Sequence, residues 1–97
     1  MTTIKLSEEY PVVVTFDSNV LEIFHEPYQQ EYRRHGLHIF WIDSIELIAD
    51  KWGNQSMVVH TTEHRDYAKW PVDENIVPKV TDLIAEIERA KASFHFD

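Results

Sequence analysis

The chain has 97 residues, of which 43% are hydrophobic and 27% charged, a balance typical of a globular domain. Seventeen Asp and Glu residues against nine Lys and Arg residues give a formal net charge of −8. This charge opposes binding to nucleic acids and to anionic membranes. No cysteine is present, which excludes disulfides, thiolate nucleophiles and thiolate metal sites.

A chain of this length is expected to form one domain, residues 1–97, because smaller pieces could not bury a core. Its first residues, MTTIK, lack the apolar segment of a secretory signal. No apolar run approaches the ~20 residues that a membrane-spanning helix needs. We therefore expect a soluble, cytoplasmic protein.

The N-terminal part of the chain predicts a β-hairpin over residues 10–26. Residues 10–16 alternate with a period of two and are rich in β-branched side chains, which favours a strand. The segment Asp17-Ser18-Asn19 has the short polar side chains of a turn. Residues 20–25, VLEIFH, then resume as a second strand.

The middle of the chain is harder to interpret. Residues 26–36 are polar without either period and predict a long loop or an irregular edge. Residues 37–42 predict a buried central strand, because apolar side chains occupy both of its faces. Residues 44–52 fit a strand or a short helix begun by Asp43 and Glu46 and ended by Gly53, and we favour the strand.

The last third predicts two short strands and a helix. The strands are residues 57–62 and 66–70, and Pro71 ends the second strand or confines it to a sheet edge. Apolar residues spaced three and four apart predict an amphipathic helix over residues 76–93. Asn75 fits its N-cap, with Pro78 in the first turn, and Leu83, Ile84 and Ile87 are expected to be buried.

The order of these elements resembles a short bacterial pleckstrin-homology-like (PH-like) domain. Residues 38–48, HIFWIDSIELI, look like the strand pair of that family, in which an aromatic-and-Ile strand breaks and then continues with alternating Ile. Residues 77–92 are similar to its closing helix. The likeness covers residues 10–92 and is one of element types rather than of motif residues.

The resemblance implies an α+β, mainly β fold, a small antiparallel sheet or PH-like barrel with a C-terminal amphipathic helix. That fold serves lipid, peptide and protein binding as well as assembly, so it does not name a function. Phosphoinositide-binding members place several Lys or Arg residues in the loop between their first two strands. The segment Asp17-Ser18-Asn19 contains none, which argues against binding to a lipid headgroup.

Two groups of residues are candidates for function. The cationic cluster Tyr32, Arg33, Arg34 and His35 could contact an anion or a partner, since arginine presents a planar fork to carboxylate and phosphate. Six histidines include the spacings His35-x-x-His38 and His60-x-x-x-His64. Neither spacing matches a zinc motif, so we predict no metal site, no cofactor and no catalytic residue.

We therefore expect a non-enzymatic protein-interaction or assembly module. A small-molecule or anion-binding domain that uses the cationic cluster is the first alternative, and a histidine-based metal-dependent enzyme is the second. The expected partner is another protein or a second copy, with a homodimer favoured, and neither nucleic acid nor membrane. The motivation is that residues 12–16 and 57–61 carry no charge to protect a sheet edge, and that three tryptophans and four tyrosines exceed the needs of a small core.

Overall fold

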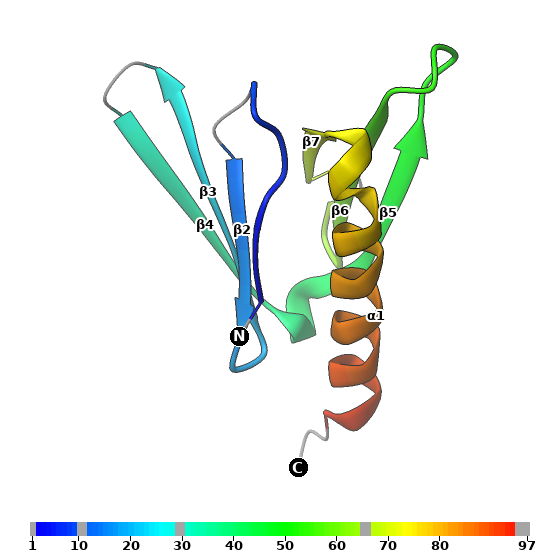
Figure 1. The fold of residues 1–97 in the computed structure, drawn as a ribbon. Helices are drawn as coiled ribbons and strands as arrows, with labels where there is room; N and C mark the ends of the chain where they lie inside the picture. The colour runs from blue at the N-terminus through cyan, green and yellow to red at the C-terminus, as the bar shows by residue number, and fades with distance from the viewer. Residues whose placement is uncertain (1, 10–11, 29–30, 65–66, 95–97) are drawn as a thin grey trace.

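The computed structural model describes residues 2–9, 12–28, 31–64 and 67–94, and for residues 26–28 and 31–35 it describes the backbone but not the side chains. Within these described ranges, seven strands form two antiparallel sheets and are followed by one α-helix (Figure 1). The predicted first residues of two strands, Tyr10 and Asp66, lie outside the described residues.

The first sheet has the order β1-β2-β3-β4. Its strands are β1 (Thr2–Lys5), β2 (Val12–Asp17), β3 (Val20–Tyr28) and β4 (Glu31–His38). The predicted hairpin is confirmed, because β2 and β3 pair from Val12↔His25 to Asp17↔Val20. Ser18 and Asn19, with φ of 51° and 66°, form the two-residue turn with positive φ that matches the twist of a hairpin.

The described part of residues 26–36 forms an irregular sheet edge, one of the two predicted alternatives, and not a long loop. The chain instead continues β3 and returns as β4, with Phe24 opposite Arg34 and His25 opposite Arg33. Pairing in a sheet needs only backbone groups, so a strand can lack an apolar period. Pro27 lies where the register shifts between His25 and Tyr28, a position at which a strand tolerates proline.

The predicted strand over residues 37–42 is also interrupted. The chain turns through the 3-10 helix η1 (Ile39–Trp41), which separates β4 from β5. His38 caps this turn, because its Nδ1 accepts a hydrogen bond from the Phe40 N–H at 3.1 Å. The apolar residues on both sides of the segment therefore belong to a corner and not to a buried central strand.

The second sheet has the order β5-β6-β7 and consists of β5 (Ile42–Ala49), β6 (Gln55–Thr61) and β7 (Ala68–Val72). Of the favoured strand over residues 44–52, residues 44–49 are a strand and residues 50–52 belong to the β5–β6 turn. Pro71 lies within β7 at the edge of the sheet, in agreement with the prediction. The expected exposed edges at residues 12–16 and 57–61 are not edges, because β2 lies between β1 and β3, and β6 lies between β5 and β7.

The C-terminal helix α1 (Val77–Ser93) follows the 3-10 helix η2 (Glu74–Ile76). Pro78 lies in its first turn, as predicted. The predicted N-cap is displaced by one residue: Ile76 occupies that position and Asn75 belongs to η2. No helix among the described residues has both the length and the apolar character needed to cross a membrane.

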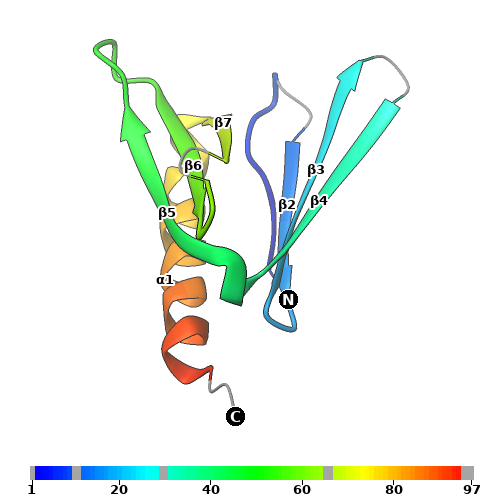
Figure 2. The ribbon, with the colours of Figure 1, turned by 180° about the vertical axis from the view of Figure 1, so that it is seen from behind.

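The core lies between the two sheets and α1. Both views show that the sheets meet near η1 and diverge from there, while α1 runs along the second sheet (Figures 1 and 2). Leu83 and Ile87 are 1% exposed and Ile84 is partly buried against the same core. Two bonds tie distant segments together: Thr2 Oγ1 donates to Glu86 at 2.6 Å, and the Asp73 N–H donates to the Leu6 carbonyl at 2.9 Å.

The protein is thus mainly β, with four strands, then three strands, then a helix. This order is consistent with a PH-like topology. Strand β1, like β4 and the two 3-10 helices, is not predicted from the sequence. Its four residues, TTIK, are too few to show a period of two.

Candidate functional site

The predicted cationic cluster lies on β4. Tyr32, Arg33, Arg34 and His35 are consecutive residues of this strand, and β4 is an outer strand of the first sheet. Their side chains lie outside the described part of the structure. An anion or partner contact at this cluster stays a prediction.

Three of the described histidines, His25, His38 and His60, have rings with structural contacts. His60 is 2% exposed, and its Nε2 lies 3.1 Å from Oε2 of Glu46 on the neighbouring strand. The His25 ring packs against Trp70 with centroids 4.6 Å apart. Among the residues described, no group of three His, Asp or Glu side chains could hold a metal ion.

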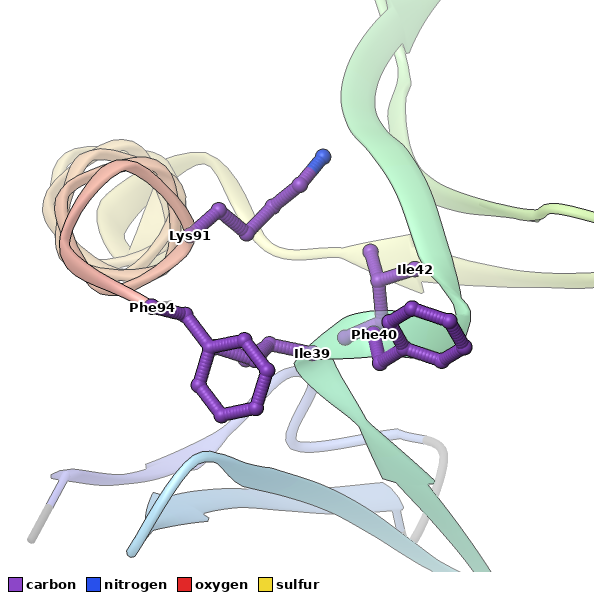
Figure 3. Close-up of a pocket in the computed structure, with 5 residues that line it drawn as sticks. All are labelled: Ile39, Phe40, Ile42, Lys91 and Phe94. Carbon is purple, nitrogen blue, oxygen red and sulfur yellow. The ribbon is translucent and has the colours of Figure 1, made fainter. Parts of the chain in front are cut away.

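An apolar pocket lies where η1 meets the C-terminal end of α1. Its volume is about 280 Å³, and it is lined by Ile39, Phe40, Ile42, Lys91 and Phe94. Figure 3 shows Lys91 and Phe94 extending from the end of the helix, opposite the three residues of η1 and β5. Four of the five lining side chains are apolar, and the remaining one is a cation.

Several hydrogen bonds fix the wall that η1 contributes. The Ile39 N–H donates to the Asn19 carbonyl at 2.9 Å, which attaches η1 to the first hairpin. The Thr62 N–H donates to the Trp41 carbonyl at 2.9 Å, which attaches it to the end of β6. The wall is therefore anchored to both sheets.

The helical wall is held by one charged contact and one aromatic contact. Lys91 Nζ donates to the Asp43 carbonyl at 2.6 Å, across the gap between α1 and β5. The Phe94 ring meets the His38 ring edge to face, with centroids 5.1 Å apart. An ammonium group has three donors, so Lys91 can offer further hydrogen bonds to an oxygen at the pocket mouth.

The 3-10 helix η1 carries two exposed aromatic side chains, Phe40, which lines the pocket, and its neighbour Trp41. Phe40 is 52% exposed and Trp41 is 48% exposed, and their rings meet edge to face at 5.7 Å. Exposed aromatic groups beside a pocket are typical of contacts with another protein, since they bury a large area at a small cost in side-chain entropy.

Two further hollows lie at the other end of the second sheet, with volumes of about 360 and 380 Å³, and both are lined mainly by polar residues. Two of the three carboxylates that line the larger one, those of Asp50 and Asp73, are already hydrogen bonded. Asp50 accepts from the N–H groups of Trp52 and Asn54, and Asp73 accepts from Ser7 and from the Glu8 N–H. These hollows therefore offer a ligand less than the apolar pocket does.

The sequence analysis misses the apolar pocket. It assigns Phe40 and Ile42 to a buried strand and places Phe94 just beyond the end of a helix. The sequence signal for the pocket is the block of four apolar residues, IFWI, immediately after His38. His38 can cap a turn, and the four consecutive apolar side chains after such a turn cannot all be buried.

Neither a family model, nor a curated protein, nor a solved structure matches this chain.

Proposed function

We propose that this chain is a non-enzymatic protein-interaction module of PH-like fold, and that a partner protein places an apolar side chain in the pocket between η1 and α1. The observation that supports this proposal is an apolar pocket of about 280 Å³ that is lined by the half-exposed Phe40, whose ring contacts the half-exposed Trp41.

The free energy available to such a contact is considerable. Complete burial of a Leu or Phe side chain stabilises by about 1.5–3 kcal/mol. Contacts with Phe40 and Trp41 add to this value, because interface energy concentrates in a few central aromatic residues. Because association itself costs at least about 4 kcal/mol, a partner must bury Phe40 and Trp41 in addition to placing one large apolar side chain in the pocket.

Lys91 gives the pocket a preference for the groups beside that apolar side chain. Its Nζ already donates to the Asp43 carbonyl, so the ammonium group is held at the pocket wall. A carbonyl or carboxylate oxygen of the partner is the complementary group. We therefore expect the partner segment to combine a large apolar residue with an adjacent acidic residue.

Selection from a random peptide library displayed on phage tests the proposal whatever the identity of the partner. Enriched peptides should share an apolar anchor next to an Asp or Glu residue. Their affinity should fall at least tenfold for Phe40→Ala, a substitution at an exposed residue that leaves the core intact. Trp52→Ala is the matched control, because Trp52 is 74% exposed but lies on the distant β5–β6 turn.

Failure to enrich any peptide, or enriched peptides that bind Phe40→Ala and the unmodified protein equally, contradicts the proposal. Amide resonances locate the binding site: those of residues 39–42 and 91–94 should shift on peptide binding, and those of the distant β5–β6 turn should not.

A further inference from the structure

Strand β5 has one long side without a strand partner. It pairs with β6 on one side and is the outer strand of its sheet. The β5–β6 turn determines which backbone groups point outward. The Asp50 N–H donates to the Asn54 carbonyl at 2.9 Å, so this pair is hydrogen bonded. Hydrogen-bonded pairs alternate along an antiparallel ladder.

Counting back from Asp50, the backbone N–H and C=O groups of the even-numbered residues of β5 therefore point toward β6. The backbone groups of Ile45, Leu47 and Ala49 point away from the sheet. The contact of Lys91 supports this assignment independently, because its Nζ donates to the carbonyl of Asp43, an odd-numbered residue. Lys91 thus covers the start of the outer edge of β5, near α1. The outward backbone groups of residues 45–49 have no described hydrogen-bond partner.

Three other described strands are outermost in their sheets: β4, which contains the charged residues Glu31, Arg33 and Arg34, and β7 and β1, whose edges are protected as follows. Strand β7 contains Pro71 and the exposed Lys69, both of which oppose pairing with another strand. Strand β1 has four residues and is tied to α1 by the bond from Thr2 to Glu86. By comparison, β5 has eight residues and carries Ile48, which is 41% exposed, on its solvent face.

We infer that β5 pairs antiparallel with β5 of a second copy of this chain, about a two-fold axis at Leu47. Leu47 then exchanges backbone hydrogen bonds with Leu47 of the second copy, and Ile45 exchanges them with Ala49. Each outward-pointing group of residues 45–49 is paired, and the two 3-stranded sheets become one continuous sheet. This interface is separate from the apolar pocket and goes beyond the proposed function.

Charge selects this register over its neighbours. With the axis at Leu47, Glu46 lies opposite Ile48 of the second copy, and the exposed Asp43 comes near Lys51. An axis at Glu46 would place two Glu46 carboxylates directly opposite each other, about 4.5 Å apart at Cα. An axis at Ile48 would place Glu46 opposite Asp50. Like charges directly opposite are destabilising.

A register displaced toward the start of β5 meets a different obstacle. An axis at Ile45 would place Asp43 opposite Leu47 of the second copy, where Lys91 already occupies the Asp43 carbonyl. It would also extend the pairing to Ile42, where the chain turns into η1. With the axis at Leu47, only residues 45–49 pair, and they lie between these obstacles and the β5–β6 turn.

Sedimentation equilibrium of the unmodified protein at micromolar concentration is the first test, with twice the chain mass of 11.5 kDa as the expected result. Ile48→Glu should raise the dissociation constant at least tenfold, because it places a second carboxylate opposite Glu46. Phe40→Ala should leave the dimer unchanged, so loss of the proposed pocket function is distinguishable from loss of the dimer. A single species of monomer mass overturns the inference.

The absence of cysteine from the chain permits a direct test of the register. We expect a mixture of Glu46→Cys protein with Ile48→Cys protein to form a disulfide-linked dimer under mild oxidation, since these positions face each other across a closely spaced pair. Each variant alone should form it at least tenfold more slowly. Equal cross-linking by Ile48→Cys alone, or none in the mixture, would overturn the proposed pairing.

Discussion

Substitution of Leu83 by alanine tests whether α1 is docked on the sheets. Leu83 is 1% exposed and belongs to the core that both sheets and the helix share. The substitution removes about three CH₂-sized groups, worth about 2.4 kcal/mol in transfer free energy at ~0.8 kcal/mol each. Because the helix and sheets can close only part of the space, a cavity adds to this value, as in other Leu→Ala changes of about 2–5 kcal/mol.

We therefore expect Leu83→Ala to lower the free energy of unfolding by about 3 kcal/mol. A chain of this size is stabilised by roughly 5–15 kcal/mol in total, so the variant should still fold. The melting temperature should fall by about 12–24 °C, at about 4–8 °C for each kcal/mol.

Urea denaturation followed by circular dichroism measures the effect. The midpoint should move to lower urea concentration with an unchanged slope, because the substitution alters stability and not the surface exposed on unfolding. Glu88→Ala, on the exposed side of the same helix, is the matched control and should stay within about 0.5 kcal/mol of the unmodified protein. A loss below about 0.5 kcal/mol for Leu83→Ala would show that α1 does not pack on the core, contrary to the value expected for a buried Leu.

Charge, composition and turn geometry support three further predictions. Binding to duplex DNA and to phosphoinositide vesicles should be undetectable at ~150 mM salt; micromolar binding that Arg33→Ala/Arg34→Ala abolishes would contradict this and locate a site on β4. Elemental analysis of untagged protein should find no stoichiometric zinc, iron or copper. One bound equivalent would contradict this prediction and favour the hypothesis of a histidine-based metal-dependent enzyme. Ser18→Asn/Asn19→Gly should raise stability by about 0.5–1 kcal/mol in urea melts, since both positions have positive φ; a loss of stability would refute the turn assignment.

The elements that the sequence predicts well are those with a clear period. The hairpin of β2 and β3 shows strict alternation and a polar turn, and α1 shows a run of apolar residues at spacings of three and four. In both cases one face of the element is buried, so the spacing of the apolar residues directly indicates which side chains face the core. The same reasoning locates Pro71 on an edge strand, because proline lacks the N–H that an inner strand needs.

The elements that the sequence predicts poorly are held by backbone groups or by distant contacts. Strand β4 pairs through its backbone, so its polar side chains give no period to detect. The corner at η1 depends on the Asn19 carbonyl, which is far from Ile39 in the sequence. The apolar pocket needs both this corner and the end of α1, and no local pattern shows that they are neighbours.

The identity of the edge strands shows the same limit. Residues 12–16 and 57–61 lack charge because they lie inside their sheets, where no protection from other chains is needed. The uncharged segments therefore indicate inner strands, and the sequence analysis interprets them in the opposite sense. Which strands are outermost depends on topology, and topology is set by the corner between β4 and β5.

The strand order has a consequence for folding kinetics. In both sheets the spatial order of the strands equals their order along the chain, so every strand pair joins sequence neighbours. Such pairs close short loops, which costs little chain entropy and favours early formation. The bonds from Thr2 to Glu86 and from Asp73 to Leu6 span most of the chain and close large loops. We therefore expect the hairpins to be formed in the folding transition state and the attachment of α1 to β1 to come afterwards, which makes that attachment a determinant of the unfolding rate.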